Sequence, residues 1–290
     1  MFDLFSAFPE FSLVAVGLLG LAIGSFLNVV IHRLPIMLER EWRQECLQFL
    51  EMESGEGAPG EPFNLAIPRS RCPSCSRSLT ILENIPVISF LILRGRCGGC
   101  GTRISVRYPV VEIMTAILSV IVAWEFGGTS QMVAALLLTW GLLALTFIDI
   151  DRHLLPDAIT LPLLWLGLLL SVFGVFTDSS SSIVGAAVGY TSLWGVFHLF
   201  KWITGREGMG YGDFKLLAVL GAWMGWLPLP LIILLSSVVG AVAGILMILC
   251  FGHDRRLPIP FGPYLAAAGW VALVWGERLN SVYLGWISSP

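Results

Sequence analysis

The chain carries Gly208-Met209-Gly210-Tyr211-Gly212-Asp213-Phe214-Lys215, a glycine-rich loop whose aspartate stands where a long apolar run begins. An ionisable side chain at the mouth of a membrane helix is costly to hold there and usually has a function. The glycines permit backbone conformations closed to other residues, so a substrate strand can approach Asp213 closely. The loop therefore predicts a functional carboxylate at the edge of a membrane.

The composition favours a membrane protein. Charged residues make up 13% and hydrophobic residues 56% of the 290 residues, against roughly 25% and 45–50% in ordinary globular domains. Apolar runs of about the 17–25 residues that cross a bilayer recur along the chain, and the sixth and eighth are shorter. We expect an all-α polytopic membrane protein with about eight transmembrane helices, near Leu13–Ile31, Val110–Phe126, Met132–Ile148, Ile159–Phe176, Ile183–Ile203, Phe214–Leu227, Pro230–Phe251 and Phe261–Trp275.

The lysine and arginine residues predict the orientation, because they gather in the cytoplasmic loops of membrane proteins. With eight spans, all of the 17 basic residues except Arg278 fall on one side. We assign that side to the cytoplasm, which places both termini in the periplasm. We expect three parts: residues 1–31 with the first span, a cytoplasmic insert at 32–109, and a transmembrane core at 110–290.

Two C-x-x-C pairs stand in the insert, Cys72 with Cys75 and Cys97 with Cys100, separated by 21 residues. Four thiolates at this spacing are typical of a zinc ribbon, in which zinc is tetrahedral and has no open position for water. We expect one structural zinc ion per chain, because the insert is too small to bury much apolar area. Disulfides and unmetallated thiols are the alternatives, and a reducing cytoplasm disfavours disulfides.

The insert also contains an acid-rich segment. We interpret it as a solvated helix followed by a loop at Ser54–Pro62, with a docking surface for a basic peptide as the alternative. Its acidic residues are Glu39, Glu41, Glu45, Glu51, Glu53, Glu56 and Glu61.

A second group of carboxylates follows the third span, where the apolar run stops at Asp149. Two spans separate Asp149 from Asp213, so the chain returns to the same face of the membrane. Two carboxylates at one depth suit a hydrolase in which the ionised one takes a proton from water and the protonated one polarises the scissile carbonyl. From the residues alone, Asp151 competes with Asp149, and Asp157 is interpreted as a helix N-cap. The alternative is that Asp149, Asp151, Asp157 and Asp213 are helix caps or interfacial charges.

Together these motifs resemble the bacterial type IV prepilin peptidases, also called leader peptidase/N-methyltransferases, over essentially the whole chain. The G-x-G-D pattern alone is weak, because presenilin-like proteases share it, but the combination is specific. The segments that carry the resemblance are Gly24-Ser25-Phe26-Leu27-Asn28-Val29-Val30, His32-Arg33-Leu34-Pro35, the two cysteine pairs, Arg107-Tyr108-Pro109 with Glu112, Asp149 with Leu155-Pro156-Asp157, Gly210-Tyr211-Gly212-Asp213-Phe214-Lys215 and Pro260-Phe261-Gly262-Pro263-Tyr264.

The resemblance implies that Asp149 and Asp213 form the catalytic pair and that Asp151 is a non-catalytic neighbour. It also implies an enzyme of the bacterial inner membrane that acts at the cytoplasmic face. Its substrates would be the prepilins of type IV pili and the pseudopilins of type II secretion. It would cleave their basic leader after a glycine and then methylate the new amino terminus, usually a phenylalanine, with S-adenosylmethionine.

Other parts of the function are less specified by the sequence. The insert has no Rossmann pattern, so the sequence assigns no residues to the methyl donor. We expect contact with membrane lipid and no nucleic-acid partner, and the sequence does not predict an oligomeric state. The competing hypotheses are a proton- or ion-coupled transporter that uses Asp149, Asp213 and Glu112, and a zinc-bearing membrane scaffold without chemistry.

Overall fold

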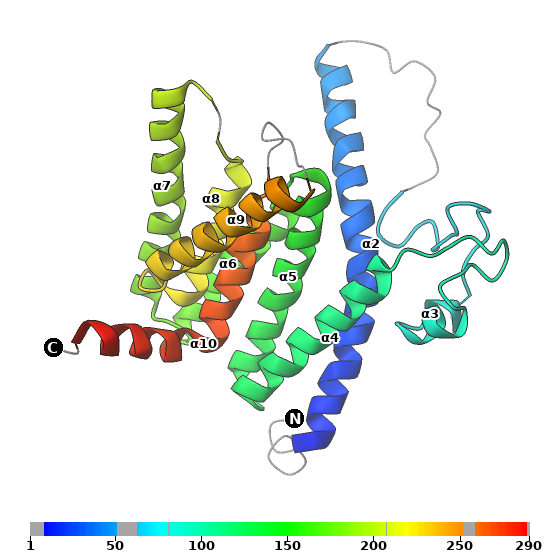
Figure 1. Ribbon diagram of the computed structural model, residues 1–290, viewed down its shortest axis with the longest axis horizontal. Helices are drawn as coiled ribbons and strands as arrows, with labels where there is room; N and C mark the ends of the chain where they lie inside the picture. Colours follow the sequence, from blue (N-terminus) through cyan, green and yellow to red (C-terminus); the bar gives the residue numbers. More distant parts are fainter. Residues whose placement is uncertain (1–8, 51–62, 81, 207, 252–258, 289–290) are drawn as a thin grey trace. The chain divides into compact units, whose positions relative to one another are not determined.

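A computed structural model describes residues 9–50, 63–80, 82–206, 208–251 and 259–288, and these residues form helices without a β-sheet. Each of the eight apolar runs falls mainly on one helix of its own, so the all-α prediction is confirmed. The elements in chain order are α2 (Pro9–Phe49), the 3-10 helix η1 (Leu82–Asn84), α3 (Ile88–Ile92), α4 (Arg107–Phe126), α5 (Ser130–Arg152), α6 (Asp157–Val172), α7 (Ser179–Thr204), α8 (Tyr211–Met224), α9 (Leu229–Phe251) and α10 (Gly262–Ser288) (Figure 1).

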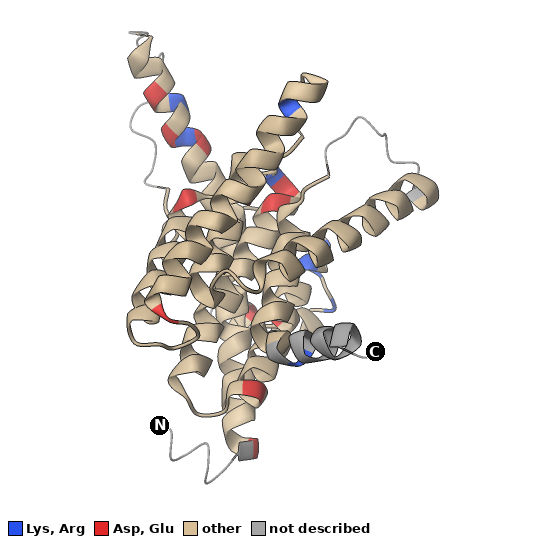
Figure 2. Ribbon diagram, turned by 90° about the vertical axis from the view of Figure 1, so that its left-hand side faces the viewer, with Lys and Arg blue, Asp and Glu red and all other residues tan. Residues whose placement is uncertain are grey.

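The helices have the length and composition of a polytopic membrane protein. Within the described residues, α2, α4, α5, α7 and α9 are each long and apolar enough to cross a membrane. The shorter α6 has 16 residues and α8 has 14. Figure 2 shows long stretches of helix without a charged residue. A helix satisfies all its backbone hydrogen bonds internally, which is what an apolar solvent requires.

The chain divides into two compact units, residues 1–128 and 129–290. In the first unit, α2 packs along α4 through glycines. A Cβ atom added at Gly20 or Gly24 would lie 2.7 Å from the Cα atom of Ala116 or Glu112, respectively. Small residues at this spacing let two membrane helices approach closely. The glycine of the first-span motif therefore brings Glu112 against α2.

The helix α2 continues well past the predicted end of the first span at Ile31 and reaches Phe49. In this extension Glu39, Glu41 and Glu45 are exposed, as the solvated-helix interpretation requires. The rest of the acid-rich segment, including the predicted loop at Ser54–Pro62, lies almost wholly outside the described residues.

In the second unit, α8 is the central helix. Every residue from Leu216 to Trp223 is buried, because α7 packs on one side and α6 and α10 pack on others. Trp223 donates its indole N–H to the carbonyl oxygen of Leu163 on α6, at 2.8 Å. A helix of 14 residues is too short to cross a bilayer alone, and here neighbouring helices cover it.

Backbone-to-backbone contact holds α7 against α8. A Cβ atom added at Gly185 would meet the carbonyl oxygen of Gly221 and would lie 2.6 Å from the carbonyl carbon of Gly225. The hydroxyl of Ser182 donates to the carbonyl oxygen of Ala222 across the same interface. Backbone atoms cannot rotate away from an added methyl group, so this interface tolerates no side chain at Gly185.

We predict that Gly185→Ala destabilises the protein, because the methyl group would push α7 and α8 apart. Overpacking of this kind costs about 1–3 kcal/mol, which corresponds to a fall in Tm of about 5 °C. Gly195→Ala is the matched control on the same helix, since nothing lies within 4 Å of its added Cβ atom. Thermal unfolding in detergent measures both variants. Equal Tm values for the two would contradict the close packing of α7 on α8.

Candidate active site and metal centre

Asp149 stands in the last turn of α5. The helix ends at Arg152, and His153 adopts a left-handed conformation whose N–H donates to the carbonyl oxygen of Asp149 at 2.9 Å. The chain then turns through Pro156 into α6. Although Asp149 is near the helix end, its exposed fraction is only 6%. The α5 terminus therefore presents a buried carboxyl group.

Asp213 stands in the first turn of α8, and its exposed fraction is also 6%. The helix begins after Gly210, whose carbonyl oxygen accepts the N–H of Asp213 at 3.3 Å. A Cβ atom added at Gly212 would lie 2.7 Å from the Cβ atom of Leu155. The second glycine of the G-x-G-D motif thus lets the loop lie directly on the segment that follows Asp149.

The structure brings the two buried carboxylates to one place. Leu155 packs against Gly212 beside Asp213, and the same side chain reaches the space beside Gly262, where Asp149 also lies. The charges of Asp149 and Asp213 are close enough to interact. Two carboxyl groups that interact in a buried site share a proton more readily than they both ionise. This arrangement can supply one acid and one base to a single reacting group.

The prediction that Asp157 caps α6 is wrong. Pro156 occupies the N-cap position, and Asp157 is the first residue of the helix. Both oxygens of its carboxylate instead accept hydrogen bonds from Lys215 Nζ, at 2.6 and 2.7 Å. This partly exposed ion pair joins the first turn of α6 to α8, at a position two residues after Asp213.

In the insert, the two C-x-x-C pairs form matching turns. The N–H of Cys72 donates to the carbonyl oxygen of Arg77, and that of Cys97 donates to the carbonyl oxygen of Thr102. Isolated antiparallel bridges close each turn, between Arg71 and Ser78 and between Arg96 and Arg103. The residue after the second cysteine has a positive φ in both turns, 55° at Ser76 and 72° at Gly101.

The four sulfur atoms converge between these turns. The Sγ atoms of Cys72, Cys75, Cys97 and Cys100 all lie within 4.8 Å of one another, with the first cysteine of each pair buried and the second exposed. Four sulfur atoms this close together match the geometry of a metal ion bound by four cysteine thiolates. The predicted ligand set can therefore hold a metal ion.

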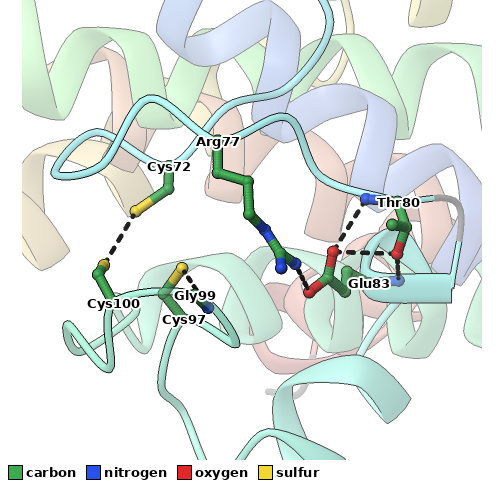
Figure 3. Close-up of polar contacts among 7 residues, drawn as sticks. All are labelled: Cys72, Arg77, Thr80, Glu83, Cys97, Gly99 and Cys100. Carbon is green, nitrogen blue, oxygen red and sulfur yellow. Dashed lines mark hydrogen bonds and ion pairs between the residues drawn. The ribbon is translucent and has the colours of Figure 1, made fainter.

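An ion pair between Arg77 and Glu83 lies beside the cysteine cluster (Figure 3). Glu83 also accepts the backbone N–H and the hydroxyl of Thr80, both at 2.9 Å. These hydrogen bonds hold the pKa of Glu83 below its usual value, and the bond from the Thr80 backbone has the largest effect. Because the pKa of Glu83 is lower in the folded protein, these bonds stabilise the fold fully above the usual carboxyl pKa. Their contribution is lost as the pH falls through the lowered pKa. The Arg77 side chain also packs on Gly99 and so links the first cysteine turn to the second.

Other polar residues of the motifs join parts of the first unit. Arg33 is buried, and its guanidinium donates to the carbonyl oxygens of Asn64 at 2.9 Å and Pro68 at 2.6 Å. Glu112 accepts the backbone N–H of Val87 at 2.8 Å. These two contacts attach the insert to α2 and to α4, respectively. They give a structural role to Arg33 and Glu112, two residues of the motifs that carry the family resemblance.

Two contacts near the carboxylates were not predicted. Sequence reasoning assigned no role to Lys215 or to Gly262, although both lie in motifs that carry the family resemblance. Their partners Asp157 and Asp149 are 58 and 113 positions away in the chain. The available signals were weak. Lys215 is a charged residue near the start of an apolar run, and Gly262 lies in an isolated Pro-Phe-Gly-Pro segment at a helix start.

The fold and these two clusters define a polytopic membrane protein with a buried pair of carboxylates and a four-cysteine site. The model of the bacterial peptidase A24 N-terminal domain matches residues 18–126, and that of the type IV leader peptidase family matches residues 136–245. These matches fall in the first and second compact units, respectively.

The chain matches curated relatives over nearly its full length and theirs. The chain is 57% identical to the prepilin leader peptidase/N-methyltransferase of Stutzerimonas stutzeri, over 92% of this chain and 91% of that protein. It is 57% identical to the protein of the same name from Aeromonas hydrophila, over 94% and 93%, and 52% identical to that of Pseudomonas aeruginosa, over 98% and 97%. No solved structure matches. The chain belongs to the type IV leader peptidase family.

We predict that the purified protein binds about one metal ion per chain, as expected for a four-thiolate site. Cys72→Ser or Cys97→Ser should remove it, because each replaces a buried ligand by a much weaker one. Cys46→Ser is the matched control, since Cys46 is an exposed free cysteine outside the cluster. Elemental analysis of the metal content measures all three. Retention of the metal in both ligand variants would show that the cluster is not the binding site.

Proposed function

We propose that this chain is a prepilin leader peptidase and N-methyltransferase whose peptidase centre is the pair Asp149 and Asp213. The observation that carries the proposal is the meeting of these two buried carboxylates in a member of this family. The relatives that match over nearly the whole chain are named for the same two activities. The transporter hypothesis has no comparable support.

The chemistry follows from the two protonation states of the pair. The ionised carboxylate takes a proton from a water molecule, whose oxygen attacks the scissile carbonyl carbon. The protonated carboxyl group donates its proton to the carbonyl oxygen, which stabilises the developing charge. Collapse of the intermediate breaks the peptide bond and delivers a proton to the leaving amine. The products are the released leader and a pilin with a new amino terminus.

The second reaction acts on that amino terminus. S-Adenosylmethionine would supply the methyl group, and the acceptor would be the α-amine that cleavage has exposed. The substrates would be prepilins and pseudopilins with a basic leader, cut after its final glycine.

The location of the centre follows from the charge distribution. Lysine and arginine gather in cytoplasmic loops, so the clustering of all basic residues except Arg278 on one side of the eight runs supports a cytoplasmic location for that side. The membrane would be the inner membrane of a bacterium. Asp149 and Asp213 would act at this face, where a leader remains while the apolar segment of the substrate lies in the bilayer. Both termini would then be periplasmic.

The four-cysteine site would hold zinc in a structural role. Four thiolates give zinc the tetrahedral coordination that it prefers, and they leave no position for a reacting water molecule. The metal would join the two cysteine turns of the insert. Peptide hydrolysis would therefore depend on the carboxylates and not on the metal.

We predict that Asp149→Asn and Asp213→Asn each abolish prepilin cleavage while the protein remains folded. An amide can neither take a proton from water nor donate the acidic proton of a carboxyl group. Asp151→Asn is the matched control, because Asp151 lies two residues further along the same helix and should be dispensable. A gel-shift assay on a purified prepilin measures cleavage, and thermal unfolding measures folding. Full cleavage by either of the first two variants would exclude the pair as the peptidase centre.

A further inference from the structure

The first turn of α10 lies over Asp149. This helix packs against both α5 and α8, which carry the two carboxylates. It begins at Gly262, after Phe261, whose carbonyl oxygen accepts the N–H groups of Tyr264 and Leu265, both at 3.1 Å. The N–H groups of a first helical turn are free to face a carboxylate.

Gly262 leaves no space for a side chain. A Cβ atom added there would lie 2.6 Å from Oδ2 and 3.2 Å from Cγ of Asp149, and 3.3 Å from Cδ1 of Leu155. The residue is also buried. The backbone of α10 is thus in direct contact with the reactive end of the Asp149 side chain, and only glycine permits this contact.

One oxygen of the Asp149 carboxyl group lacks a hydrogen-bond partner at the same point. Among the described residues, its Oδ2 is the single buried side-chain oxygen or nitrogen without a hydrogen-bond partner. A buried carboxylate oxygen without a partner is costly, and proteins retain such atoms mainly where they have a function. Gly262 therefore touches the atom that is free to act on a water molecule or on a shared proton.

We propose that Gly262 is a positioning residue of the active centre. Because it has no side chain, the first turn of α10 closes over the Asp149 carboxyl group and holds it in the orientation that serves Asp213 and the substrate. This role rests on the proposed peptidase function. With this role, residues of three helices, α5, α8 and α10, form the active centre. The Pro-Phe-Gly-Pro segment then has the function of bringing Gly262 to Asp149.

The test is Gly262→Ala in the full-length protein, assayed on a purified prepilin. The added methyl group must displace the end of the Asp149 side chain, which can rotate, so Tm should change little. A misplacement of about 1 Å at a catalytic group costs on the order of 100-fold in rate. We expect kcat for cleavage to fall roughly 10- to 100-fold and KM for the prepilin to stay unchanged. Methyl transfer to a pilin already lacking its leader should also stay unchanged.

Two glycines of the same helix provide controls. A Cβ atom added at Gly276 has nothing within 4 Å, so Gly276→Ala should match the wild type in every assay. At Gly269 it would meet the side chain of Leu220 on α8, so Gly269→Ala disturbs the packing of α10 away from the carboxylates. That variant should lower Tm and leave kcat for cleavage within a factor of about 3.

The outcomes separate the inference from the proposed function. Wild-type kcat in Gly262→Ala would overturn the inference and leave the peptidase function intact. Equal losses of cleavage and methyl transfer, or a loss that Gly269→Ala reproduces, would overturn it in favour of a structural role. If the wild-type protein cleaved no prepilin, the proposed function would fail and the positioning role would fail with it.

Discussion

The burial of two carboxylates in an apolar helical bundle is the constraint on which the second unit depends. A carboxylate costs free energy when it leaves water, so the packing around it must be strong enough to hold it. The central helix α8 provides this by burying every residue from Leu216 to Trp223. Its contact with α7 is made through glycine backbone, and the indole of Trp223 is bonded to α6. Asp213 is therefore carried on a rigid element.

Asp149 is also held in place by the structure around it. The end of α5 is turned by the left-handed His153, and Leu155 then packs on the glycine loop beside Asp213. The ion pair between Asp157 and Lys215 joins α6 to α8 in the same region. Catalytic groups must be held within a fraction of an ångström to be effective. The short segments after each carboxylate thus serve the same purpose as the long helices, since they fix one carboxyl group relative to the other.

The sequence predicts the features that depend on local physical requirements, and it misses those that arise from tertiary packing. Apolar runs predict helices because a bilayer offers the backbone no other partner, and the C-x-x-C spacing predicts the cluster of Cys72 and Cys97 because metal ligation needs it. Hydropathy could not show that α2 extends to Phe49, because the extension is polar. The helix continues there because its polar residues are good helix formers. Nor could it place Gly262 against Asp149, or Asp157 against Lys215, because those contacts join distant parts of the chain.

The central claim is that one chain both removes a leader and methylates the amino terminus that results. Its most direct test is the reaction of the purified wild-type protein with one purified prepilin and S-adenosylmethionine, followed by mass spectrometry of the pilin amino terminus. The account predicts a pilin that begins immediately after the leader glycine and carries one additional methyl group. An intact leader, cleavage at another peptide bond, or a correctly cleaved amino terminus without the methyl group would contradict it.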